Sequence, residues 1–177
     1  MFGIKRSAVP QHALLRTHGG RHPERWGGYQ DCFRVRISGS ISLAEFVFAF
    51  YTSRVFKLER LLLRTFLGIR SSDEDAQTLI AGTTDTFAAW YQGARTPSEL
   101  LMCDRFESTR SWFMVEPVAG GASELCFGSA VASGLGRSAM PSRFRLLLVF
   151  HVLYSQVLLH SAVRGLVRGE SLKAPLN

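Results

Sequence analysis

The sequence predicts an α+β domain built on one antiparallel sheet. A segment of alternating polarity at 30–38 precedes two or three helical segments, and four strand-like segments joined by turn residues follow between 84 and 132. A long apolar helix closes the pattern at 143–168. A run of hairpins flanked by helices is typical of α+β proteins. Because one face of an antiparallel sheet needs cover, we expect the final helix to pack across it.

The first strand and the helix after it are predicted from periodicity and capping. Phe33, Val35 and Ile37 alternate with polar residues, which predicts a strand with one face toward a core. Ser42 and Glu45 have the spacing of a capping box, in which each side chain bonds the backbone of the other residue. A helix therefore begins at Ser42.

The second helix, about 55–67, is two-faced. The apolar residues Val55, Leu58, Leu62 and Phe66 share one side, and the basic residues Lys57, Arg60 and Arg64 share the other. Gly68 is expected to end the helix in the left-handed conformation. A basic stripe of this kind is usually a solvated face, although phosphates or lipid head groups are alternatives.

The remaining elements alternate between turns and regular structure. A short third helix is expected at 72–81, and strands at 84–94, 100–106, 110–118 and 124–132. Gly120 and Gly121 predict the turn of the last hairpin. A stretch rich in glycine, serine and arginine at 133–142 leads to the final helix.

Length and composition bound the class of protein. The chain has 177 residues, of which 46% are hydrophobic, enough for one domain with a sizeable core. This composition excludes a disordered, collagen-like or disulfide-stapled chain. We expect a disordered basic tail over 1–28, a folded domain over 29–168 and a C-terminal tail over 169–177.

The net charge of +7 lies mostly in the first 28 residues, where five cationic residues face Glu24 alone. A basic tail on a near-neutral domain is not typical of nucleic-acid binding, so no nucleic-acid partner is expected. Weak attraction to an anionic membrane surface is an alternative to a simply solvated extension.

The cysteines and histidines form no metal or disulfide pattern. Cys32, Cys103 and Cys126 lie far apart without a CxxC motif, which favours a reducing, cytoplasmic compartment. His18 and His22 are separated by glycines and lack a rigid scaffold, so no metal or cofactor is expected. The uncharged segment 146–163 includes two histidines, two serines and a glutamine, which favours a buried helix over a membrane span.

The order of elements resembles the helix-grip architecture of START-type lipid-binding domains and polyketide cyclases, in which a curved antiparallel sheet wraps around a long C-terminal helix. Five phrases are similar to an uncharacterised bacterial family catalogued as a domain of unknown function. They are Asp85-Thr-Phe-Ala-Ala-Trp90, Leu100-Leu-Met-Cys-Asp104, Arg110-Ser-Trp-Phe-Met-Val-Glu116, Phe127-Gly-Ser-Ala-Val131 and Phe150-His-Val-Leu-Tyr154. This resemblance implies the helix-grip fold over about 29–168 and no established activity.

Candidate site residues lie on the later strands and the final helix. Arg110, Trp112 and Met114 share one face of a strand, but both faces are apolar at its middle, so periodicity does not decide which faces inward. Asp104 on the preceding strand is expected near Arg110, either as a polar anchor in a cavity or as half of a surface pair. His151 and Tyr154 lie one helical turn apart and face a cavity or the core.

Three functions follow as hypotheses. The first is a domain that binds a small apolar ligand between sheet and helix, lined by Trp90, Trp112, Met114, His151 and Tyr154, with Asp104 and Arg110 as polar anchors. The second is an enzyme of cyclase or hydrolase type that uses His151 or Asp104 as a general acid or base in the same cavity. The third is a peripheral membrane protein held by the basic tail and the stripe Lys57, Arg60 and Arg64. The ligand and the oligomeric state stay open.

Overall fold

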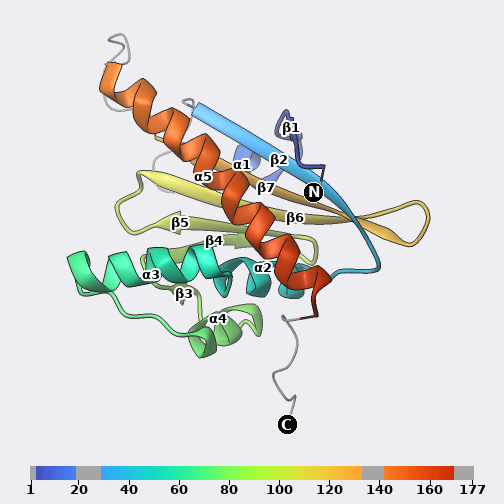
Figure 1. The fold of residues 1–177 in the computed structure, drawn as a ribbon, viewed down its shortest axis with the longest axis horizontal. Helices are drawn as coiled ribbons and strands as arrows, with labels where there is room; N and C mark the ends of the chain where they lie inside the picture. The colour runs from blue at the N-terminus through green and yellow to red at the C-terminus, as the bar shows by residue number, and fades with distance from the viewer. Residues whose placement is uncertain (1–2, 19–28, 133–141, 170–177) are drawn as a thin grey trace.

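One sheet of seven antiparallel strands organises the molecule (Figure 1). The computed structural model describes residues 3–18, 29–132 and 142–169, and for 142–152 the backbone alone. The spatial order of the strands is β1-β2-β7-β6-β5-β4-β3. The predicted α+β class, with an antiparallel sheet and a C-terminal helix, is confirmed.

The strands and helices follow the sequence predictions closely in the central part of the chain. The strands are β1 (Lys5–Ser7), β2 (Tyr29–Ser38), β3 (Thr86–Phe87), β4 (Trp90–Arg95), β5 (Glu99–Asp104), β6 (Thr109–Val118) and β7 (Ala122–Val131). The helices are α1 (Leu14–Thr17), α2 (Leu43–Tyr51), α3 (Arg54–Leu67), α4 (Asp73–Ile80) and α5 (Ser142–Val167). The segment expected as one strand at 84–94 is a tight pair of strands, β3 and β4, because Ala88 adopts a positive φ of 51° between them.

Local signals set the bounds of the two helices after β2. The capping box of Ser42 and Glu45 is present at the start of α2. The Ser53 side chain accepts a hydrogen bond from the Phe56 backbone at the start of α3, and Gly68 ends that helix at a φ of 68°. Since only glycine adopts this conformation without steric cost, α3 stops where the sequence predicts.

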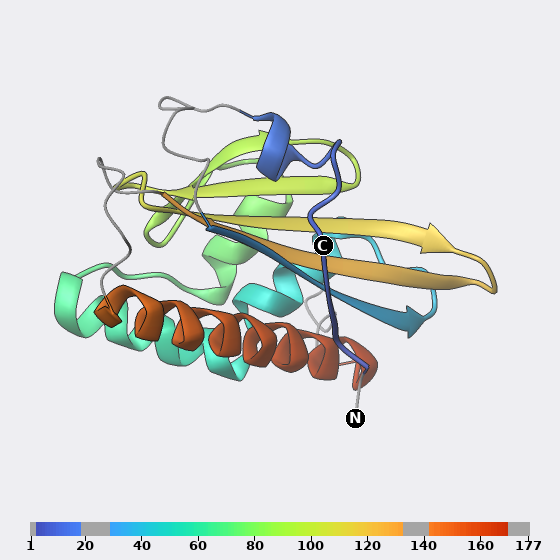
Figure 2. The ribbon, with the colours of Figure 1, turned by 90° about the horizontal axis from the view of Figure 1, so that it is seen from above.

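Helices cover one face of the sheet, which we call the inner face (Figure 2). Alternate residues of β2, β5, β6 and β7 pack there against α2 and the second half of α5, with Phe50 of α2 at the centre. The Phe50 ring lies 4.8 Å from that of Phe113 and 4.6 Å from that of Phe127. This aromatic contact fills the space between the middle of the sheet and α2.

The N-terminal segment covers the opposite face, which we call the outer face (Figure 2). We expected residues 1–28 to form a disordered tail, and for 5–17 that expectation is corrected. β1 pairs with β2, and Ala13 and Leu15 are fully buried against Trp112 and Cys126. Burial of these few apolar groups, together with strand pairing, orders a segment whose sequence has no periodicity.

Polar contacts fix the N-terminal segment to the sheet. Glu99 of β5 accepts hydrogen bonds from the Leu14 amide at 2.9 Å and from the Trp112 indole at 2.7 Å. Gly128 leaves room for this cover, because a Cβ there would lie 2.8 Å from the Trp112 ring and 3.2 Å from Leu15. The outer face is therefore a second core, closed by residues 9–15.

Candidate functional site

The structure divides the predicted site residues between the two faces of the sheet. Arg110, Trp112 and Met114 lie on the outer face, where each is 1% exposed or less beneath the N-terminal segment. Trp90 and Tyr154 pack at the edge of the inner core, on the other side of the sheet. His151 belongs to α5, and its side chain lies outside the described residues. The sheet therefore separates the two groups expected to line one cavity.

The two expected polar anchors have separate partners. Asp104 accepts five hydrogen bonds from residues 106–109, and so closes the turn between β5 and β6. Arg110 donates to the His18 carbonyl oxygen at 2.8 Å, on the outer face beside Cys103. Burial lowers the pKa of the Arg110 guanidinium, while Cys103 and Glu107 oppose that shift. These contacts describe structural roles for both side chains.

Tyr154 forms a polar pair with Glu59, a residue that was not predicted as part of a site. The Tyr154 hydroxyl donates a hydrogen bond to the Glu59 carboxylate of α3. Burial raises the pKa of the Glu59 carboxyl above its ordinary value, and the hydrogen bond from Tyr154 only partly opposes this shift. The buried Tyr51 hydroxyl has no hydrogen-bond partner within the described part of the chain. Glu59 lies one turn after Phe56, on the side of the helix that packs inward. A carboxylate on the inward side of a helix is unusual, and this feature of the sequence could have identified Glu59 as a candidate site residue.

Most of the exposed large apolar side chains in the described part of the chain lie on α3. Leu58, Leu61, Leu62 and Phe66 form what we call the apolar stripe, with exposed fractions of 58%, 55%, 49% and 76%. Phe56 is the buried residue of this helix. The amphipathic pattern predicted from the sequence is present, but its apolar side faces away from the core. Scattered exposed leucines are ordinary, whereas a contiguous set on one helix indicates an interaction surface.

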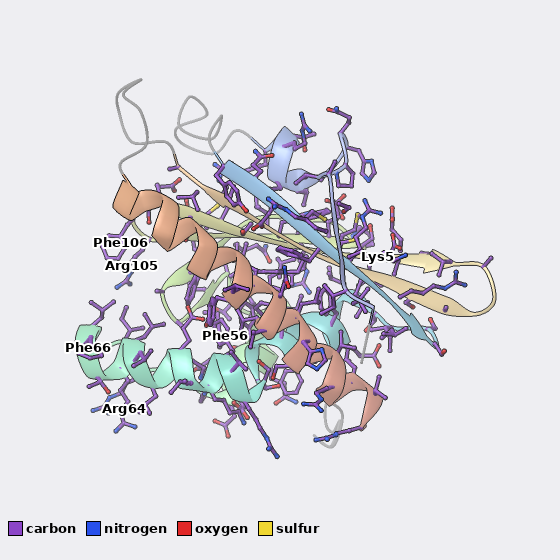
Figure 3. All side chains as sticks on the ribbon, turned by 45° about the horizontal axis from the view of Figure 1, so that its top comes forward. Lys5, Phe56, Arg64, Phe66, Arg105 and Phe106 are labelled. Atoms are coloured by element: carbon purple, nitrogen blue, oxygen red, sulfur yellow. The ribbon has the colours of Figure 1, made fainter. Side chains whose placement is uncertain are left out.

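Another exposed aromatic residue lies toward the same end of the molecule. Figure 3 shows Phe66 and Arg64 of α3, and Phe106 and Arg105 of the β5–β6 turn, toward one end of the fold. The Phe106 side chain is 66% exposed. The apolar surface at this end therefore comes from two segments that are far apart in the sequence.

Basic side chains flank the apolar stripe. Lys57, Arg60, Arg64 and Arg70, which we call the basic edge, line a hollow of about 360 Å³ together with Leu61 and Ser71. Asp73 of α4 holds two of these cations, with Lys57 Nζ and Arg60 Nη1 each 2.6 Å from its carboxylate oxygens. Burial raises the pKa of Asp73, but the hydrogen bonds from Lys57 and Arg60 outweigh that effect and hold the pKa below its ordinary value.

A second hollow, of about 490 Å³, opens between α2, the start of α3, α4 and the end of α5. Its walls carry both signs of charge, including Arg54, Glu74 and Arg164. It shares Lys57 with the smaller hollow. Both hollows lie among the helices, and Trp90, Trp112 and Tyr154 line neither of them.

The chain matches no protein-family model, no curated protein and no solved structure. Among the described residues, no helix is both long enough and apolar enough to cross a bilayer.

Proposed function

We propose that the protein associates peripherally with anionic membrane surfaces, with α3 lying in the interface. The observation that carries this proposal is the apolar stripe, four large side chains about half exposed or more on one face of a helix whose other side is anchored in the fold. A helix that is amphipathic and exposes its apolar side is suited to the boundary between head groups and acyl chains.

Charge complementarity favours a membrane over a protein partner as the occupant of the stripe. The basic edge runs beside the stripe on the same helix, and the whole chain carries a net charge of +7. Each lysine or arginine near an anionic leaflet contributes about 1 kcal/mol of attraction. Burial of apolar surface then supplies the remaining affinity at about 25 cal/mol per Å².

Anchoring of α3 supports the same proposal. Its first turn packs through Phe56, whose ring lies 4.9 Å from that of Tyr51. One turn later, Glu59 accepts a hydrogen bond from the Tyr154 hydroxyl of α5. The helix therefore presents the stripe from a fixed orientation before any membrane is met. Such preorganisation reduces the entropy lost on binding.

Vesicle flotation tests the proposal. The full chain is expected to float with vesicles that contain phosphatidylserine, and the double variant Leu62→Gln/Phe66→Gln to lose at least about tenfold in affinity, given the apolar area removed. Glutamine keeps helix propensity, so the fold is expected to persist. Val167→Gln is the matched control, because Val167 is 60% exposed at the end of α5, which lies on the other side of the molecule from the end of α3 (Figure 1). Equal flotation of all three proteins would overturn the proposal. Self-association of the chain through the stripe in the absence of vesicles would also overturn it.

The helix-grip fold itself is a proposal. Its support is the order of elements: β2, then helices, then the strands β3 to β7, then α5 lying diagonally across the sheet (Figure 1).

Binding of a small apolar molecule between the sheet and α5, or its conversion there, is the second candidate function. The observation that favours it is the polar group of Glu59, Tyr154 and Tyr51 beside the half-buried Trp90, since the unpaired Tyr51 hydroxyl is a donor available to a ligand. Mass spectrometry of small molecules released from the natively purified protein tests it. A stoichiometric compound lost in Tyr51→Phe would support this candidate, and an empty protein would contradict it.

A further inference from the structure

We infer that the hollow beside the apolar stripe is a site for the phosphate monoester head group of a lipid. This inference rests on the proposed function, because it names the lipid chemistry that the same surface recognises. It goes further by assigning selectivity to particular side chains, whereas a merely basic surface attracts every anionic lipid alike.

The composition of the hollow favours phosphate. Three arginines and one lysine converge on about 360 Å³, and three of the four are guanidinium groups, whose planar forks match phosphate oxygens in bidentate geometry. A phosphate monoester carries between one and two negative charges at neutral pH and three acceptor oxygens. It therefore satisfies more donors at once than a phosphodiester such as that of phosphatidylserine, which carries one charge and two unesterified oxygens.

Asp73 prepares part of the site. Its ion pairs hold Lys57 and Arg60, and Arg60 also donates to the Ser71 carbonyl oxygen at 2.7 Å. One carboxylate thus orients two cations without neutralising the hollow. Its lowered pKa keeps it ionised at neutral pH.

The other two arginines supply the capacity to bind. Arg64 and Arg70 are exposed, and across residues 3–18, 29–132 and 142–169 the ion pairs found include neither of them. They stand on the last turn of α3 and in the segment that follows it, on opposite sides of Gly68. A bound phosphate would bridge these two segments.

The position of Leu61 favours a lipid as the source of the phosphate. Leu61 lines the hollow and also belongs to the apolar stripe. A phosphate in the hollow would therefore lie next to a surface suited to acyl chains, at the level where phospholipid phosphates lie relative to an interfacial helix.

Vesicles of two compositions test the inference. Phosphatidylcholine vesicles are prepared with phosphatidic acid or with phosphatidylserine, adjusted to the same surface potential. The wild-type chain is expected to bind the phosphatidic acid vesicles roughly tenfold more tightly, the difference expected from one added charge-assisted contact. Arg64→Gln/Arg70→Gln is expected to bring the ratio of the two affinities close to one. Arg16→Gln, which removes an exposed charge on the outer face, should keep the wild-type ratio.

The stripe variant separates this inference from the proposed function. Leu62→Gln/Phe66→Gln should weaken binding to both vesicle types by the same factor and keep their ratio. Tight binding without selectivity in the wild-type chain would overturn the phosphate site and leave membrane association standing. Failure of the wild-type chain to bind either vesicle would overturn both.

A titration with inorganic phosphate, at constant ionic strength and without vesicles, distinguishes a lipid from a dissolved ligand. We expect binding weaker than that to phosphatidic acid vesicles by about a hundredfold or more, because the acyl contact with the stripe is missing. Binding to inorganic phosphate as tight as to the vesicles, and lost in Arg64→Gln/Arg70→Gln, would overturn the lipid as the source.

Discussion

Two successive helices, α2 and α3, have apolar stripes of similar kind and opposite fates. Six of the nine residues of α2 are buried, and its aromatic side chains fill the inner face of the sheet. In α3, Phe56 is the buried residue and five other large apolar side chains are exposed. An amphipathic pattern therefore predicts a helix and its two sides, but not what covers the apolar side.

The two helices also differ in what fixes them. α2 is held by ring contacts of Phe50 with Phe113 and Phe127. α3 is held by one buried ring at its start, by the bond between Glu59 and Tyr154, and by the ion pairs of its basic side with Asp73. Its apolar stripe therefore contributes little to the stability of the fold and is available for a function.

The largest difference is expected from removing one aromatic ring in each helix. Phe50→Ala should lower the free energy of unfolding by about 3–5 kcal/mol, because it leaves a cavity in the centre of the inner core. Phe66→Ala should change it by no more than about 0.5 kcal/mol, because that ring is exposed. Urea denaturation of both variants gives the two values. A loss of several kcal/mol in Phe66→Ala would show that the stripe is part of the core and would remove the contrast.

The short helix α1 tests whether burial, and not helix length, decides how much a segment contributes to the free energy of unfolding. Leu15 is 1% exposed although α1 has only four residues. Leu15→Ala should lower the free energy of unfolding by about 2–4 kcal/mol, since Leu15 covers the outer face beside Trp112. The same urea titration measures this effect. A change as small as that of Phe66→Ala would mean that the N-terminal segment is not a structural part of the domain.

A smaller effect is expected from the carboxyl that joins α3 to α5. Because the folded state raises the pKa of Glu59, the folded protein binds this proton more tightly than the unfolded chain does. Stability should therefore fall as the pH rises from the ordinary glutamate pKa, near 4.5, through the raised value. Glu59→Gln, which still accepts a bond from Tyr154, should remove this slope. The thermal midpoints of both proteins across that range check the prediction, and parallel curves would contradict it.

The part of the fold that the sequence predicted is the part governed by local chemistry. Alternation in β2, the capping box of Ser42 and the glycine at Gly68 act over a few residues, and each is present where predicted. The ordered segment 5–17 was missed because a three-residue strand and a four-residue helix have no period. It is fixed by distant contacts, such as that between Leu14 and Glu99.

The candidate site was less predictable, because it depends on which face of each element is covered. In β6, Phe113 enters the inner core and Trp112 the outer one, so both faces are apolar and the pattern carries no direction. The predicted set therefore mixed residues from the two faces. For α3, a stripe that faces a core and a stripe that is exposed have the same sequence pattern. The structure distinguishes them, because Phe56 and Glu59 face the fold and the stripe lies on the other side of the helix.

A polarity-sensitive fluorophore on the stripe tests most directly whether α3 contacts the membrane. The three native cysteines are all buried, so Leu62→Cys is expected to label selectively, as is Val167→Cys at the far end of α5. With anionic vesicles that contain lipids brominated on the acyl chains, the label at 62 should shift to the blue and be quenched, while the label at 167 should not change. Equal responses of the two labels, or no response at 62 under conditions where the protein floats with the vesicles, would contradict the claim that α3 is the membrane-contacting surface.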